Sequence, residues 1–282
     1  MKNWGKKLFG ISFLLFIIGV CGLVWLFSKQ EYFAFSLKKV EQQQTIEQDF
    51  KAVDVSTGTA DLVITPAKVE KATVRLVGEV AEMQKDRLQF TSEVRPDGTL
   101  VVYVQEKLRV SLFYIGNDDL KLEVTLPEKQ YESIRLKTDT GNITSGALTA
   151  RKADIASHTG DLELNGFAGE RLDIQTDTGD MQLAGIRAAV TIDTATGDID
   201  KLILPELTQN TTIRTDTGDV RMEVEKQPEK AQLELSTDTG TIEAGWQGMS
   251  YEEKDRYYMK GTLGTAGPKV YVKTSTGDIR IQ

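Results

Sequence analysis

Aspartate residues recur at one position of a short motif, and their carboxylates are the groups of this chain whose spacing could support chemistry. Asp161, Asp180, Asp198 and Asp219 each follow the glycine of a (Thr/Ser)-x-Thr-Gly-Asp motif. If the motifs stack, these carboxylates form a row, and Ca²⁺ takes several such oxygen ligands. Aspartate also caps tight turns through its own backbone, and calcium-binding nonapeptide repeats are much denser in glycine and aspartate. We therefore expect turn capping, with calcium at the row as the alternative.

A second row of carboxylates is predicted beside the first. Asp139, Asp177, Asp216 and Asp238 stand two residues before the motif glycine. The same two interpretations apply to them. Two rows of like charge repel each other unless Lys, Arg or a cation lies nearby, so the sequence leaves open what neutralises them.

Side chains for other kinds of catalysis are scarce. His158 is the only histidine, and its sister positions hold Asp or Ala. This count excludes a histidine-dependent triad or a multi-histidine metal site, and no Gly-x-Ser-x-Gly elbow is present. Two carboxylates at a suitable separation would suffice for glycoside hydrolysis. We predict a protein that is not an enzyme and has no cofactor or metal, with a carboxylate-dependent enzyme on envelope glycan as an alternative.

The spacing of the motif predicts the elements that position these carboxylates. From Gly141 to Gly240, successive motif glycines are 19, 19, 18, 21 and 22 residues apart. A period of about 20 residues is typical of a solenoid, whose repeats bury their apolar faces against each other. Glycine supplies the positive φ that such tight turns demand. The predicted turn glycines are Gly58, Gly141, Gly160, Gly179, Gly197, Gly218, Gly240 and Gly277.

Apolar residues alternate on both sides of each motif, which is typical of strands. Leu172 and Ile174 precede Gly179, and Met181 and Leu183 follow it. Each repeat is then two short strands and two turns, stacked in parallel ladders about 4.8 Å apart. We predict an all-β fold, a parallel β-solenoid with about 20 residues per coil.

Two segments depart from the regular repeat. Residues 72–126 lack the motif but keep strand-like runs, so we expect hairpin-decorated N-terminal coils that cap the stack. Gly240 and Gly277 are 37 residues apart, which predicts two repeats whose middle mark has decayed to residues 263–267.

The N-terminus predicts a membrane anchor. Residues 8–27 are uncharged and long enough to cross a bilayer as a helix, and Lys2, Lys6 and Lys7 precede them. A cleaved signal peptide is the alternative, but the run is too long and no small-x-small site follows. We expect a cytoplasmic N-terminus (1–7), a single-pass transmembrane anchor (8–27), a linker or stalk (28–49) and an extracytoplasmic β-solenoid (50–282).

Composition limits the partners. The chain has 34 Lys and Arg against 42 Asp and Glu, a net charge of −8, and no basic stripe, which excludes nucleic acid. Two apolar stretches could contact a protein or cell-wall polymer, and both could instead be core or cover an edge. The candidate contact residues are Phe113, Tyr114, Trp246, Tyr251, Tyr257 and Tyr258.

The motifs carry a resemblance. The serial turns, the strand end Val124–Pro127 and the closing segment Val270–Ile279 resemble a bacterial adhesin-like domain of unknown function over roughly residues 50–282. With its N-terminal anchor the layout is similar to LiaG-like proteins of Gram-positive bacteria, which implies a β-solenoid, a link to envelope stress and no defined catalytic residues. We predict a membrane-anchored extracytoplasmic binding or scaffold module of the cell envelope, with the enzyme and a calcium-stiffened spacer as alternatives.

Overall fold

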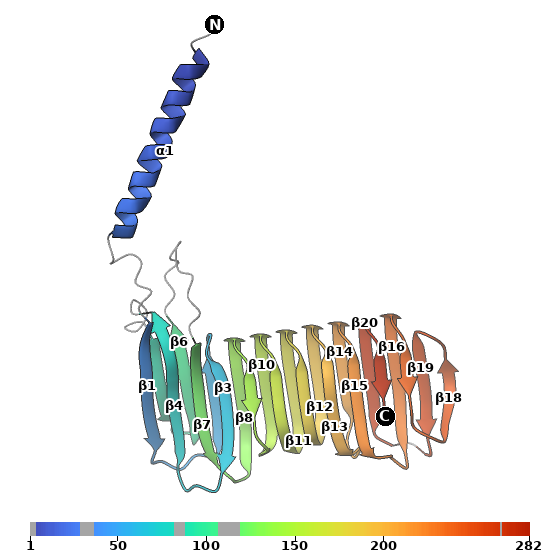
Figure 1. Ribbon diagram of the computed structural model, residues 1–282. Helices are drawn as coiled ribbons and strands as arrows, with labels where there is room; N and C mark the ends of the chain where they lie inside the picture. Colours follow the sequence, from blue (N-terminus) through green and yellow to red (C-terminus); the bar gives the residue numbers. More distant parts are fainter. Residues whose placement is uncertain (1–3, 29–36, 82–87, 107–118, 266) are drawn as a thin grey trace.

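The protein is nearly all β-structure in the computed structural model, which describes residues 4–28, 37–81, 88–106, 119–265 and 267–282 (Figure 1). These residues form one helix, α1 (Trp4–Ser28), and 21 strands. The helix stands apart from the strands (Figure 1). Over the residues described, no helix combines the length and the apolar character needed to pass through a membrane.

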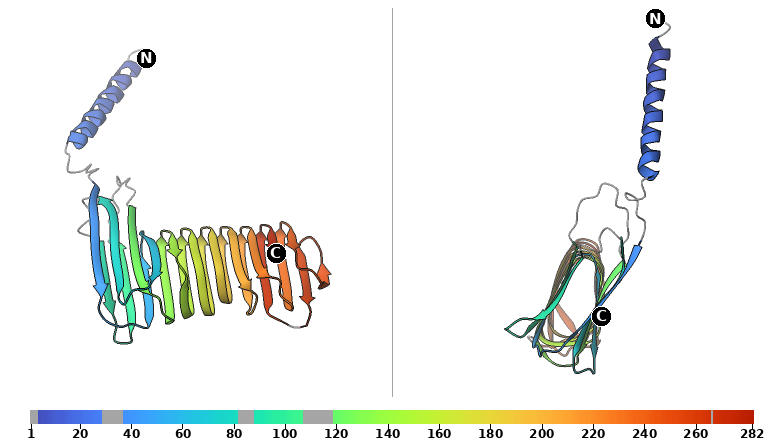
Figure 2. Two further views of the ribbon diagram at one scale, coloured as in Figure 1. Left: turned by 60° about the horizontal axis from the view of Figure 1, so that its bottom comes forward. Right: turned by 90° about the vertical axis from the view of Figure 1, so that its left-hand side faces the viewer.

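The middle of the protein is a stack of coils, and the predicted solenoid-like arrangement is confirmed there. Each coil contributes one strand to each of two faces, and equivalent strands of successive coils pair in parallel. Leu172, for example, pairs with Ala153 in one neighbouring coil and with Val190 in the other. Figure 2 shows the coils stacked around an elongated cross-section. The strands are β8 (Tyr131–Thr140), β9 (Ile143–Ser145), β10 (Leu148–Thr159), β11 (Leu162–Thr178), β12 (Met181–Thr196), β13 (Ile199–Glu206), β14 (Thr211–Thr217) and β15 (Val220–Lys226).

Two edges join the faces. At the turn edge the motif turns, such as the one between β10 and β11, lead from one face to the other. At the far edge the chain bends within β11 and β12 or passes through the loops 207–210 and 227–230. The motif side chains therefore gather along the turn edge.

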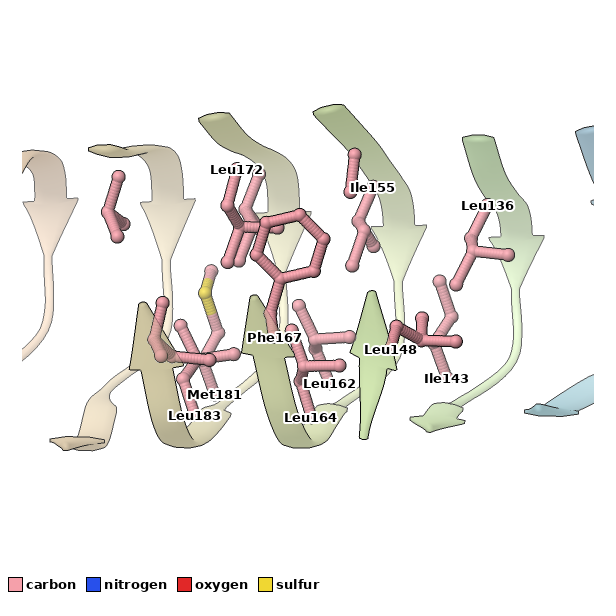
Figure 3. Packing of buried hydrophobic residues seen from close by; sticks show 14 of the residues in the cluster. Leu136, Ile143, Leu148, Ile155, Leu162, Leu164, Phe167, Leu172, Met181 and Leu183 are labelled. Atoms are coloured by element: carbon pink, nitrogen blue, oxygen red, sulfur yellow. The ribbon is translucent and has the colours of Figure 1, made fainter. Parts of the chain in front are cut away.

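Apolar side chains from both faces fill the inside of the stack. Along β10, Ile155 and Ser157 are buried, whereas His158 is exposed. Figure 3 shows Leu172 and Leu162 reaching inward from opposite faces, with the ring of Phe167 between them. Burial of apolar surface contributes about 25 cal/mol per Å², so a slip of one residue, which would turn these side chains outward, is strongly disfavoured.

At the C-terminal end the coils do not follow chain order. The last coil, β20 (Lys269–Thr276) and β21 (Ile279–Ile281), lies between the β14–β15 coil and the coil of β16 (Ala231–Thr239) and β17 (Ile242–Ala244). The strands β18 (Met249–Lys254) and β19 (Tyr258–Leu263) then extend the sheet in antiparallel fashion beyond β16. The prediction of two repeats between Gly240 and Gly277 is therefore wrong, because this interval forms an antiparallel cap.

The N-terminal end is built in the same way. The coil of β2 (Ala52–Thr57) and β3 (Asp61–Ala67) lies between the β8–β9 coil and an outer coil, β6 (Thr99–Glu106) and β7 (Asp119–Pro127). Antiparallel strands pair with that outer coil, which confirms the predicted hairpin decoration of the N-terminal coils. They are β4 (Ala72–Ala81) beside β7, β5 (Leu88–Val94) beside β6, and β1 (Leu37–Ile46) beside β4.

The prediction of a linker or stalk over residues 28–49 is wrong for Leu37–Ile46, which form the strand β1. Leu37 pairs with Ala81, and the whole strand follows β4 to Ile46. Val40 and Ile46 are buried, so two apolar residues among glutamines and glutamates fix a strand that composition alone made look like a stalk. Leu37, at the start of β1, lies beside the end of β4. That end of β4 lies beside the start of β7, since Glu79 pairs with Asp119, and β7 starts at the turn edge. The chain therefore enters the β-structure at the turn edge.

Candidate functional site at the turn edge

A column of glycines in direct backbone contact forms the centre of the turn edge. Its spatial order is Gly160, Gly179, Gly197, Gly218, Gly277 and Gly240, with φ from +136° to +154°. A Cβ on Gly179 would lie 2.1 Å from the carbonyl oxygen of Gly160. The predicted positive φ is confirmed at these six glycines, and the close contact is a second reason that only glycine fits.

Two predicted turn glycines behave differently. Gly58 lies opposite Asp139, because Thr57 pairs with Thr138, and a Cβ there would meet nothing within 4 Å. Gly58 does lie in the turn between β2 and β3, but Ala60 holds the position of the motif glycine in this coil, because pairing of Leu62 with Ile143 sets the register. Gly141 is in the turn position but lacks a positive φ.

The motif aspartates link each coil to the next through a hydrogen bond from a backbone N–H to a side-chain oxygen, which we call the clasp. The Oδ1 atom of Asp161 accepts a hydrogen bond from the backbone N–H of Asp180 at 2.9 Å, and Oδ1 of Asp180 accepts one from Asp198 at 2.8 Å. The same bond joins the pairs Asp61–Asn142, Asn142–Asp161, Asp198–Asp219, Asp219–Asp278 and Asp278–Thr241. Turn capping was expected within each turn; the structure shows it between turns, where bonds to ionised carboxylates are stronger than neutral ones.

Thr241 ends this row, which accounts for the one motif with Thr in place of Asp. Its backbone N–H and its Oγ1 both donate to Oδ1 of Asp278, at 2.7 and 2.9 Å. These two bonds, together with the nearby charges of Arg280 and Arg221, hold the pKa of the Asp278 carboxyl below its ordinary value. Thr241 has no carboxylate that could accept a hydrogen bond from the backbone N–H of a further coil.

The second acidic row is interrupted in space. Pairing of Thr274 with both Thr215 and Thr237 places Ser275 between Asp216 and Asp238. The spatial order of the row is Asp139, His158, Asp177, Ala195, Asp216, Ser275 and Asp238. Every aspartate is thus separated from the next by a residue that is not an acid, and this alternation reduces the repulsion that the sequence alone left unexplained.

The two threonines of the motif have opposite roles. The first one points inward; Thr176 Oγ1 donates to Thr194 Oγ1 at 2.8 Å, and Thr237 Oγ1 donates to the Gly277 carbonyl at 2.9 Å. The second one is exposed in every motif coil. These exposed residues form a row in the order Thr140, Thr159, Thr178, Thr196, Thr217, Thr276 and Thr239. Sequence reasoning did not separate the two roles, although strand alternation could have done so.

A shallow hollow lies on each side of this threonine row. One, of about 260 Å³, is lined by residues that include His158, Asp177 and Gln175. His158 Nδ1 is 2.8 Å from Asp177 Oδ2, so the sole histidine is paired with the neighbouring coil. The other, of about 300 Å³, is lined by residues that include Asp161 and Glu163. Among the side chains described, no cluster of three or more His, Cys, Asp or Glu is placed to hold a metal ion.

The aromatic candidates are not gathered into one surface. Trp246 is only 5% exposed and packs in the core, so its assignment as a contact residue is wrong; it follows β17, where Gly245 is bonded to Ile281. Tyr251 is half-buried against the core, and Tyr258 is half-buried as well. Tyr257 is 45% exposed at the C-terminal cap. Phe113 and Tyr114 lie outside the described residues.

Comparison with known proteins agrees with this repeat. The family model for Toastrack DUF4097 matches residues 50–202 and 146–282. The chain belongs to the Toastrack family. This confirms the resemblance to an adhesin-like domain of unknown function. No protein in a search of curated sequences matches the chain.

Crystal structures of bacterial proteins are similar to this Toastrack chain at low identity. A putative adhesin from Bacteroides fragilis is 16% identical, with 87% of this chain and 97% of that chain covered and a TM-score of 0.46. A putative cell adhesion protein from Clostridium sporogenes is 14% identical, with 86% and 99% covered and a TM-score of 0.39. A putative lipid binding protein from Parabacteroides distasonis is 12% identical, with 86% and 96% covered and a TM-score of 0.33.

Proposed function

We propose that this Toastrack protein is a binding module of the bacterial cell envelope that presents its turn edge to a partner protein or a wall polymer. The observation that carries the proposal is the row of exposed threonines, which repeats once per coil. This row lies between the two rows of aspartate, of which one is bonded to backbone amides of the next coil and the other is interrupted by residues that are not acids. Successive coils are about 4.8 Å apart. A rigid array of this kind suits a partner with many weak contact points, because linked contacts gain in avidity.

The proposal includes a single-pass anchor at residues 8–27, with the N-terminus in the cytoplasm and the β-structure outside. The described apolar side chains of α1 support it, since they are exposed with no covering strand; Phe9 is 74% exposed and Phe16 is 67% exposed. Exposed apolar side chains of this kind are stabilised by a protein core or by a lipid environment. The lysines before residue 8 support the orientation.

A link to envelope stress is part of the same proposal and rests on the resemblance to LiaG-like proteins. Binding is favoured over catalysis because one oxygen of each motif aspartate is already used by a backbone amide of the next coil. A calcium-stiffened spacer remains the competing proposal. It requires the thermal midpoint of the full chain to rise with added calcium and fall with a chelator, whereas the binding proposal expects no change with either.

Photo-crosslinking in living cells tests the binding surface. A photoreactive residue at Thr178 lies in the exposed row, and one at Arg187, which is exposed at the far edge, is the matched control. We expect Thr178 to capture a discrete protein or wall polymer and Arg187 to capture much less. Equal capture at both positions, or none at Thr178, would contradict the proposal.

A further inference from the structure

The outward side of β20, which lies between β14 and β16, differs in charge from that of the other motif strands on its face (Figure 1). Within this fully described strand, the outward residues are Lys269, Tyr271, Lys273 and Ser275, so the column holds two cations and no acid. Every other motif strand of this face has at least one outward carboxylate. Examples are Asp139 in β8, Asp154 in β10, Asp177 in β11, Asp193 in β12, Asp216 in β14 and Asp238 in β16.

A third cation stands beside this column. Arg214 of β14 is exposed and pairs directly with Lys273 of β20, and like charges at directly opposite positions repel each other. Arg214 Nη1 is 3.3 Å from Oδ1 of Asp193, which engages one of its five donors. Lys273 forms no ion pair with any residue that the structure describes, and its neighbour on the other side is Ser236. The positive charge at this place is therefore not balanced within the described chain.

Tyr271 holds two of the three cations in place. The guanidinium carbon of Arg214 is 5.5 Å from the centre of the Tyr271 ring, and the Nζ atom of Lys269 is 5.4 Å from it. Both distances are within the range of cation–π attraction. Side chains that are already ordered lose less freedom when a ligand binds. We call Arg214, Lys269, Tyr271 and Lys273 the basic patch.

The same face contains a like-charge pair that the protein does neutralise. Lys152 and Arg171 also pair directly, across β10 and β11. Arg171 Nε is 2.5 Å from Oδ2 of Asp173, and this bond and charge, together with the charge of Asp154, raise the pKa of Arg171 above its ordinary value. Repulsion between cations is thus balanced by acids in this pair, whereas the basic patch is left to attract an anion from outside.

The basic patch is continuous with the row of exposed threonines. Ser275 and Thr276 follow Lys273 on the same strand, and Thr276 belongs to that row. A hydroxyl group can both donate and accept a hydrogen bond, whereas Lys and Arg only donate. A ligand that matches both parts carries hydroxyl groups beside negative charges, as a polymer of sugar or polyol units with anionic groups does.

We propose that the basic patch binds the anionic groups of a cell-wall polymer, whose hydroxyl groups contact the neighbouring threonine row. This inference rests on the proposed binding function and names the polymer, in place of a protein, as the partner. Anions that repeat along a polymer offer the patch many equivalent partners, which raises the overall affinity. The attraction acts between exposed charges, so salt weakens it.

Binding of two labelled polyanions to the full chain in detergent tests the inference. The probes are polyphosphate and polyglutamate, followed by fluorescence anisotropy at low salt. One variant carries Arg214→Gln with Lys273→Gln. The matched control carries Lys152→Gln with Arg171→Gln, which changes the net charge equally at a directly paired position of the same face.

We expect the patch variant to bind roughly tenfold more weakly than the unchanged chain, since each exposed ion pair contributes up to about fivefold. The control variant should lose much less. A selective loss with polyphosphate assigns phosphate as the anion, and one with polyglutamate alone assigns carboxylate.

Equal losses in both variants, or no binding of either probe, would overturn the inference. The proposed function fails separately, because capture of a partner at Thr178 in cells does not depend on either probe. A chain that captures a partner at Thr178 but shows equal losses keeps the proposed function and loses the basic patch as its anion site.

Discussion

Replacement of Gly179 by alanine is the sharpest test of the packing at the turn edge. At φ +141° an added Cβ would meet the Gly160 carbonyl oxygen at 2.1 Å, well inside van der Waals contact. The backbone conformation alone costs about 1–2 kcal/mol for a residue with a Cβ. Separation of the coils would also break one or two ladder hydrogen bonds, worth about 1 kcal/mol each. The expected loss is therefore about 2–4 kcal/mol.

Two other glycines separate the cost of the backbone conformation from the cost of the close contact between coils. Gly185 has φ +66°, but an added Cβ there would come no closer than 3.8 Å to another atom, so Gly185→Ala should cost only the backbone term, about 1 kcal/mol. Gly58 has neither a positive φ nor a contact within 4 Å, so Gly58→Ala should cost almost nothing. The three variants form a graded series at matched chemistry.

Urea and thermal unfolding of the full chain in detergent, followed by the circular dichroism of the β-structure, give the comparison. At about 2–4 °C per kcal/mol for a protein of this size, Gly179→Ala should lower the thermal midpoint by roughly 4–16 °C. If Gly179→Ala and Gly185→Ala lose the same stability, the contact between stacked glycines is not what holds the turn edge together.

Three further results are expected. Asp180→Ala, which removes the acceptor for the Asp198 amide, should lower the urea midpoint more than Asp180→Asn, which keeps an oxygen there; equal losses would show that the clasp does not matter. Because bonding lowers the pKa of Asp278, its contribution is present above the ordinary carboxyl pKa and is lost as pH falls through the lowered value. Thr241→Val should therefore destabilise at neutral pH and lose its effect in acid, whereas Thr239→Val, on an exposed threonine, should show no such dependence. Ser275→Asp, which places three carboxylates in succession, should destabilise more at low salt than at high salt, and an effect independent of salt would argue against the spatial order of the second row.

The regular coils were predictable because each one is specified by residues that are close together in the sequence. Alternation around Gly179 and the fixed motif spacing were enough to predict parallel strands, and Leu172 indeed pairs with Val190 one period later. The Thr-Gly-Asp turn likewise predicted where polar groups would gather. What local pattern could not supply was the partner of each bond, since the Asp180 carboxylate binds the next coil and not its own turn.

The two ends were not predictable in the same way, because coil order there departs from chain order. Nothing in the spacing from Gly240 to Gly277 indicates that the later turn lies inside the earlier one. The residue types do contain a signal in retrospect, namely Ser275 in the acidic row and Thr241 in the amide-bonded row. The strand β1 was missed for a simpler reason: Val40 and Ile46 are too few to produce visible alternation among polar neighbours.

The interleaved ends constrain how this protein can change in length. An extra coil added beyond β18 or β1 would meet antiparallel strands with no motif turn, so it would find neither a glycine to stack on nor an aspartate to clasp. An extra coil placed between β10 and β12 would meet both on each side. We therefore expect duplication or loss of about 20 residues to be tolerated in the middle and not at the ends. The span that the rod covers is adjustable without altering either closing structure.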